Sequence, residues 1–71
     1  VTVMEAERMV DEYIDECSLS GLKVVSVIHG KGTGALRAAV QQRLKRNKLV
    51  ESYRLGTFGE GESGVTIVTL K

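Results

Sequence analysis

The stretch that most constrains the fold is a strand-like run that passes directly into a glycine-rich loop and then into a helical pattern. Residues 24–28 are V-V-S-V-I, and this almost wholly apolar, β-branched run predicts a strand covered on both faces, central in a parallel or mixed sheet. Glycine occupies every second position from 30 to 34, and residues 35–46 have apolar side chains at helical spacing. The chain therefore mixes strands and helices.

A helix of about eighteen residues is predicted ahead of this strand, because the usual start and stop signals frame it. Thr2 and Glu5 fit a capping box, and Gly21 suits the left-handed position that ends a helix. Apolar side chains recur on one face and are expected to pack in the core. They are Ala6, Met9, Val10, Tyr13, Ile14 and Cys17.

The C-terminal part predicts two strands joined by a loop. Residues 49–55 and 65–70 have strand character, and we expect them to pair antiparallel. Residues 56–64 contain four glycines in nine positions, which predicts a flexible loop. The element order is α-β-α-β-β in a single domain, 1–71. A helix that opens such a domain normally follows a strand, so we expect a larger parent protein to supply one just before Val1.

Charge is distributed unevenly along the chain, although the net charge is only +1. Acidic side chains gather in residues 1–20 and basic ones in residues 21–54, which favours a polyanion as partner of the basic part. The alternative is that both clusters are solvated helix faces. One cysteine excludes a disulfide-built scaffold and fits a cytoplasmic protein. No apolar run is long enough for a membrane span, so no membrane partner is expected.

The glycine-rich loop is the candidate functional site. A loop that leads into a helix N-terminus presents backbone N–H groups to an anion, and glycines let a phosphate approach closely. Lys31 adds a positive charge, and Thr33 can cap the helix or donate its hydroxyl. The His29 imidazole can exchange a proton near neutral pH, which suits general acid or base chemistry. The alternative is a structural histidine.

Two nucleotide-binding motifs also contain glycine-rich loops of this kind. The ATP-type motif G-x-x-x-x-G-K-[ST] is not matched. The dinucleotide fingerprint G-x-G-x-x-G/A is matched formally by Gly30, Gly32 and Ala35. Its ribose-binding acid would have to be Glu51, which lies near the start of its strand and thus at the wrong end of the sheet. Binding of a dinucleotide is therefore not favoured.

Residues 29–37, H-G-K-G-T-G-A-L-R, resemble the H-G-x-G-x-G signature of the Smr (small MutS-related) domain. The closing run 64–70, G-V-T-I-V-T-L, is similar to the last strand of that family, and Val3, Glu5 and Ala6 fit the start of its first helix. The resemblance spans essentially the whole chain. It is strongest to the C-terminal Smr domains of bacterial MutS proteins of the second type.

The resemblance implies a fold and a function. The family fold is β-α-β-α-β-β, an α+β / α/β two-layer sandwich similar to the C-terminal domain of translation initiation factor 3. Its first strand, absent from this chain, carries the motif L-D-x-H or L-D-x-R that nucleolytic members need. The implied function is DNA nicking, on branched or duplex DNA or recombination intermediates, within a MutS-like, ATP-binding homodimer. Some relatives act on RNA or at ribosomes.

Residue roles follow from the same resemblance. His29 is the expected catalytic residue, and a divalent metal such as magnesium stays open as a cofactor. Glu60 and Glu62 are interpreted as loop solubility rather than metal ligation. The expected phosphate-binding residues are Gly30, Lys31, Gly32, Thr33, Gly34 and Arg37.

The alternative function is a binding module without catalysis. Outside the predicted core only Tyr53 and Phe58 are aromatic, so we expect backbone contacts rather than base stacking as the main mode of binding.

Overall fold

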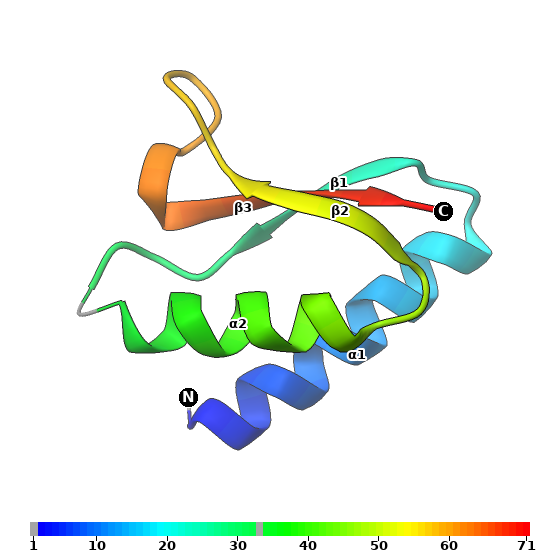
Figure 1. Ribbon diagram of the computed structural model, residues 1–71, viewed down its shortest axis with the longest axis horizontal. Helices are drawn as coiled ribbons and strands as arrows, with labels where there is room; N and C mark the ends of the chain where they lie inside the picture. Colours follow the sequence, from blue (N-terminus) through cyan, green and yellow to red (C-terminus); the bar gives the residue numbers. More distant parts are fainter. Residues whose placement is uncertain (1, 33) are drawn as a thin grey trace.

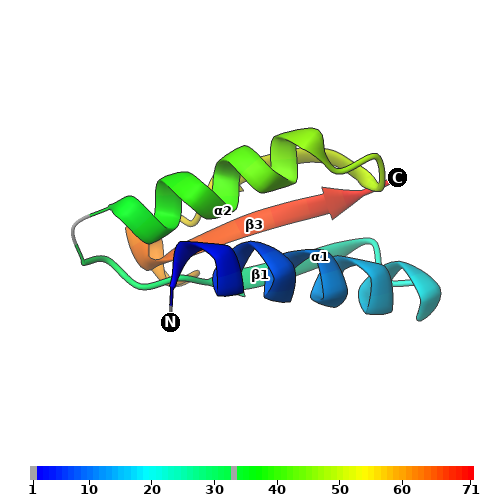
Figure 2. The ribbon, with the colours of Figure 1, turned by 90° about the horizontal axis from the view of Figure 1, so that it is seen from below.

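Two helices pack on one face of a three-stranded sheet in the computed structural model, which describes residues 2–32 and 34–71 (Figures 1 and 2). The predicted two-layer fold and the order α-β-α-β-β are confirmed. The elements are α1 (Val3–Leu19), β1 (Val24–Ile28), α2 (Ala35–Arg46), β2 (Val50–Leu55), the 3-10 helix η1 (Glu62–Gly64) and β3 (Val65–Leu70). Neither helix is long and apolar enough to cross a membrane.

The last strand lies in the middle of the sheet, whose order is β1-β3-β2. Both pairings are antiparallel, as expected for β2 and β3, and they align Ile28 with Val65 and Leu55 with Thr66. The carboxyl ends of β1 and β2 therefore meet beside the amino end of β3. This arrangement brings residues 29–32, Gly34 and residues 56–64 to one end of the sheet, at the left in Figure 1, which we call the loop end.

The prediction that β1 is a central strand covered on both faces is wrong. In the part of the chain that the structure describes, β1 pairs only with β3 and forms an edge of the sheet. Val25 and Val27 are buried toward the helices, whereas Val24 is 60% and Ile28 81% exposed on the other face. Both helices lie on one side, so the apolar run does not signal burial on both faces (Figure 2).

Helix α1 begins and ends as its sequence predicts. The Glu5 backbone N–H donates to Thr2 Oγ1 at 3.1 Å, and the Thr2 N–H donates to Glu5 Oε1 at 3.4 Å, which completes the capping box. At the other end Gly21 has φ +76°. The Leu22 N–H donates to the Cys17 carbonyl at 3.0 Å, the 6→1 bond of a Schellman motif.

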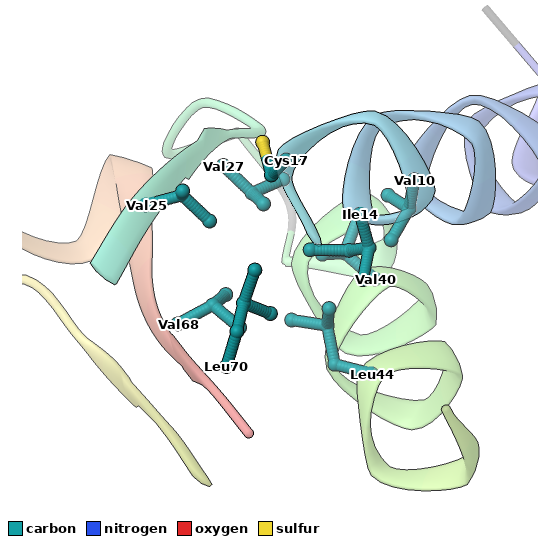
Figure 3. Packing of buried hydrophobic residues seen from close by; sticks show 9 residues of the cluster. All are labelled: Val10, Ile14, Cys17, Val25, Val27, Val40, Leu44, Val68 and Leu70. Atoms are coloured by element: carbon teal, nitrogen blue, oxygen red, sulfur yellow. The ribbon is translucent and has the colours of Figure 1, made fainter. Parts of the chain in front are cut away.

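The core lies between the two helices and the covered face of the sheet (Figure 3). Ile14 and Leu44 are fully buried and face Val68 and Leu70 of the central strand. Its buried apolar side chains are Val10, Ile14, Cys17, Val25, Val27, Val40, Leu44, Val68 and Leu70.

Two side chains assigned to the core from helical spacing lie elsewhere. Met9 is 55% and Tyr13 40% exposed, because the free edge of β1 leaves that side of α1 uncovered. They line an apolar groove of about 440 Å³, together with Val27, Ile28 and Leu36. The helical stripe therefore continues past the core into this groove.

Candidate functional site

The glycine loop is fastened to the start of the central strand. The His29 and Gly30 N–H groups both donate to the Gly64 carbonyl, at 3.1 and 2.9 Å. A Cβ on Gly64 would lie 3.3 Å from Lys31 Cγ and 3.6 Å from the Gly30 carbonyl carbon, so the absence of a side chain lets the segments approach closely. Gly30 has φ +82°, a conformation that favours glycine. The path of the loop away from β1 is thus fixed at its first two residues.

The His29 ring belongs to a hydrogen-bond network that links the glycine loop, β3 and α2. Its Nδ1 lies 2.9 Å from the Gly30 carbonyl oxygen, and its Nε2 lies 2.8 Å from Oγ1 of the fully buried Thr66. The Gln41 amide of α2 also donates to Thr66 Oγ1, at 3.4 Å. A carbonyl oxygen only accepts, so Nδ1 carries a hydrogen, and in the neutral ring Nε2 accepts from the Thr66 hydroxyl.

This arrangement serves both interpretations of His29. Two bonded ring nitrogens on a half-buried side chain are typical of a structural histidine. A hydroxyl can also rotate to accept a hydrogen bond, so Thr66 can partner Nε2 whether or not that nitrogen is protonated. Thr66 can therefore hold the ring in place in either protonation state.

Lys31 extends from the glycine loop to the neighbouring loop, where its Nζ lies 3.0 Å from Glu62 Oε2. Both side chains are more than half exposed, and ion pairs of this kind contribute little stability. An incoming anion can therefore compete with Glu62 for the lysine. Glu62, interpreted from the sequence as a solubility residue, is the partner of the candidate phosphate contact.

Helix α2 opens on the glycine loop with no acidic residue in its first turn. Gly34 precedes the helix with φ +88°, and a Cβ added there would lie 3.0 Å from Arg37 Nη2. The Arg37 guanidinium therefore packs against the loop backbone, where it adds to the positive end of the helix dipole. Thr33, predicted to cap the helix or donate its hydroxyl, lies outside the described residues.

Residues 56–64, predicted as a flexible loop, form a hydrogen-bonded turn followed by the 3-10 helix η1. The Glu60 carboxylate accepts from Arg54 Nη1 at 2.7 Å and Nη2 at 3.0 Å, and from the Thr57 N–H and hydroxyl at 2.9 and 2.8 Å. The Glu60 N–H closes the turn by donating to the Thr57 carbonyl at 2.9 Å. Hydrogen bonds from Arg54 and then Thr57 lower the pKa of Glu60 to about 2. Glu60 is thus the brace of a turn, not a solubility residue.

Most remaining basic side chains lie far from the glycine loop. Arg43, in the last turn of α2, pairs with Asp11 at 2.7 Å, and the carboxylate raises the pKa of Arg43. With Arg46 and Lys48 it lines a polar cleft of about 440 Å³. At 1.5 Å per residue, this turn is about 15 Å from the start of the helix. By contrast, the two charged residues predicted to contact phosphate, Lys31 and Arg37, both lie at the loop end.

The residues that sequence reasoning missed are Thr66, Gln41 and Arg54. Thr66 interrupts the apolar face of β3 at a buried position, and such a threonine needs a partner, which could have pointed to the histidine. The contacts of Arg54 and Gln41 depend on which strands and helices pack together, and no pattern of neighbouring residues predicts them. Within residues 2–32 and 34–71, no group of three or more His, Cys, Asp or Glu side chains is placed to hold a metal ion.

A family model described as the Smr domain matches residues 1–71. The chain belongs to the Smr domain family. The structure is similar to the crystal structure of the Smr domain of Thermus thermophilus MutS2, with a TM-score of 0.96 and 46% sequence identity. The match covers 100% of this chain and 89% of that one. YdaL, a stand-alone small MutS-related protein from Escherichia coli, has 29% identity and a TM-score of 0.85, over 99% of this chain and 58% of its own.

Curated relatives named Endonuclease MutS2 are much longer than this Smr domain. That of Acetivibrio thermocellus is 60% identical over 67 residues, which is 94% of this chain and 8% of the relative. That of Agathobacter rectalis is 51% identical over 70 residues, 99% of this chain and 9% of the relative. The chain thus spans less than a tenth of the length of these relatives.

The braced turn gives a pH-dependent prediction for Glu60→Gln. Because the folded pKa of Glu60 is about 2 against an ordinary value of 4.5, its ionised form stabilises the fold above pH 4.5. That contribution is lost as the pH falls through 2. We expect Glu60→Gln to lower the thermal midpoint at pH 7, and the difference from wild type to shrink between pH 4.5 and 2.

Glu51→Gln is the control, because it makes the same charge change on an exposed position of β2. It should leave the midpoint near the wild-type value at both ends of the pH range. A Glu60→Gln deficit that stays constant down to pH 2 contradicts the brace.

Proposed function

We propose that this Smr domain binds nucleic acid through its loop end and nicks DNA. The proposal rests on the glycine loop, which is hydrogen-bonded to Gly64 and leads into the N-terminus of α2. The first turn of α2 has no acidic residue, and Lys31 and Arg37 lie beside the loop. The relatives named endonuclease support the nuclease part. We place the domain in a longer, cytoplasmic, MutS-like ATPase that forms a homodimer and acts on branched or recombination DNA intermediates.

Phosphate is the chemical group that suits this site. Gly32, with no Cβ and nothing close to where one would lie, leaves room for a phosphate oxygen against the backbone. The helix dipole and Arg37 favour an anion there, and Lys31 can exchange Glu62 for it. These contacts recognise the sugar–phosphate backbone and carry no sequence information, so we expect sequence-independent binding.

Cleavage of a phosphodiester adds the oxygen of water to phosphorus and breaks the bond to one sugar oxygen, which leaves with a proton. Negative charge grows on the phosphoryl oxygens in the transition state, where Lys31 and Arg37 can offset it. His29 is our candidate for the proton transfer, once its Nε2 exchanges the Thr66 hydroxyl for the reacting oxygen. Residues 30–34 hold the phosphate in this proposal. Thr33 is included because of its place in the H-G-x-G-x-G motif.

A non-catalytic binding module is the second candidate, and one observation favours it. Both ring nitrogens of His29 already have partners within the protein, as expected if the ring only shapes the loop. The glycine loop, Lys31 and Arg37 would then hold nucleic acid for another part of the parent protein. RNA is an alternative ligand for such a module, so binding assays should include a matched RNA strand.

The Lys31–Glu62 pair gives a prediction for affinity. Glu62→Gln removes the competing carboxylate, so we expect DNA to bind several-fold tighter at low salt, whereas Glu51→Gln, the same charge change on β2, has a smaller effect. Lys31→Gln should weaken binding more than Lys45→Gln, because Lys45 is in the last turn of α2.

DNA affinity should fall as salt rises, with a slope of log affinity against log salt concentration of about −0.9 per phosphate contact on duplex DNA. Equal effects of the paired variants, or affinity that is flat with salt, would contradict the proposed interface.

The groove beside β1 supports a further part of the proposal, that the segment preceding Val1 in the longer protein adds a strand to the free edge of the sheet. Strand addition would pair the exposed N–H and C=O groups of β1 and cover Ile28, Met9 and Tyr13. A chain extended by that segment should melt several degrees higher, because a small core gains apolar contacts. An unchanged melting temperature by calorimetry would contradict the added strand.

Nicking of supercoiled plasmid by the extended domain tests the role of His29. If His29 transfers a proton, His29→Ala should reduce nicking by about 10²- to 10⁴-fold while DNA affinity changes only a few-fold. Because both ring nitrogens are bonded, we also expect a loss of about 1–3 kcal/mol of stability, measured by urea unfolding. Nicking that survives in a folded His29→Ala domain would contradict proton transfer by His29 and leave the ring only a structural role in the loop.

A further inference from the structure

Phe58 is the most exposed large hydrophobic side chain of the described residues, at 92%. It lies in the turn between Thr57 and Glu60, at the loop end of the molecule. Burying an aromatic ring from water is favourable, so a ring held almost wholly in solvent is available to a partner. Nothing in the description of the glycine loop accounts for it.

Hydrogen bonds order the backbone of the turn that carries this ring. Gly59, next in the chain, has φ +88°, and the bonds from Thr57 and Arg54 to the Glu60 carboxylate close the turn on both sides. A loop of small, flexible residues would lose conformational entropy on binding, whereas a braced turn has already lost it in the free protein. The backbone on both sides of Phe58 is therefore already ordered before a ligand binds.

A protein partner would need a larger apolar surface than one ring offers. The neighbours of Phe58 in the turn are a threonine, a glycine and a glutamate, whereas stable protein interfaces bury hundreds of Å² on each side. A single exposed ring matches the flat face of one nucleobase, against which aromatic side chains stack. The strand register and the Lys31–Glu62 pair place this turn at the same end of the sheet as the candidate phosphate site.

We propose that Phe58 stacks on one unpaired nucleobase while the glycine loop holds the phosphate backbone. The inference rests on the proposed function and narrows its substrate class. Bases inside a duplex are stacked on one another and offer no free face, so the domain should prefer single-stranded, bulged or branched DNA to perfect duplex. One ring is no stacking platform, and the backbone contacts remain the main source of affinity.

Binding of the 71-residue chain to three fluorescein-labelled DNAs tests the inference: a 20-nucleotide strand, its perfect duplex, and that duplex with a one-base bulge. Stacking of one base on an aromatic ring corresponds to roughly 5- to 150-fold in affinity. Phe58→Ala should therefore lower the affinity for the single strand and for the bulged duplex by a factor in that range. Duplex affinity should change less than twofold. Phe58→Tyr should restore binding, because its ring stacks equally well. Leu19→Ala, at an 89% exposed position at the end of α1, is the matched control and should change none of the three.

A second measurement reports stacking directly. The chain has no tryptophan, so in Phe58→Trp the introduced indole is the sole tryptophan, and stacking on a base should quench its fluorescence. We expect quenching by the strand and the bulge and little by the duplex. Unchanged indole fluorescence at saturating strand, or an equal loss of affinity for all three DNAs in Phe58→Ala, would overturn the inference while leaving the proposed function intact. Wild-type chain that binds none of the DNAs would overturn both.

Discussion

The arrangement of the loop end depends on one carbonyl group, that of Gly64. It accepts hydrogen bonds from the His29 and Gly30 N–H groups just where β1 ends and β3 begins. This fixes the direction in which the glycine loop leaves the sheet, and it sets the His29 ring within reach of Thr66. The close approach requires a residue without Cβ at position 64, since a side chain there would press on Lys31 and Gly30. A glycine that serves as an anchor is thus as important as those that make the loop permissive.

The contacts around this anchor differ in how readily they can be exchanged. The His29–Thr66–Gln41 bonds are half-buried, and breaking them would leave polar groups without partners. The Lys31–Glu62 pair is exposed and can yield to another anion at little cost. The loop end therefore combines a backbone anchored at His29 and Gly30 with an exchangeable charge at Lys31, which is suited to binding phosphate.

Local chemistry made part of this structure predictable. The caps of α1, the bounds of α2 and the glycine loop follow from side chains within a few residues of each other, and the family signature placed His29, Lys31 and Arg37 at the loop. The edge position of β1 was missed because an apolar run has the same pattern whether one face or two are covered. The braced turn was missed because the Arg54–Glu60 contact spans six residues and depends on how β2 ends. Glycine content indicates where a chain can turn, but not whether other side chains then fix it.

The proposed interface places nucleic acid at the glycine loop rather than at the basic far end of α2. Backbone amide shifts in ¹H–¹⁵N spectra, followed while a 20-nucleotide strand is added to the 71-residue chain, distinguish these two sites. We expect the largest shifts on amides of residues 30–37 and on Gly64, with small shifts around Arg43, Arg46 and Lys48. Shifts concentrated at that far end, with residues 30–37 unchanged, would contradict the proposed interface.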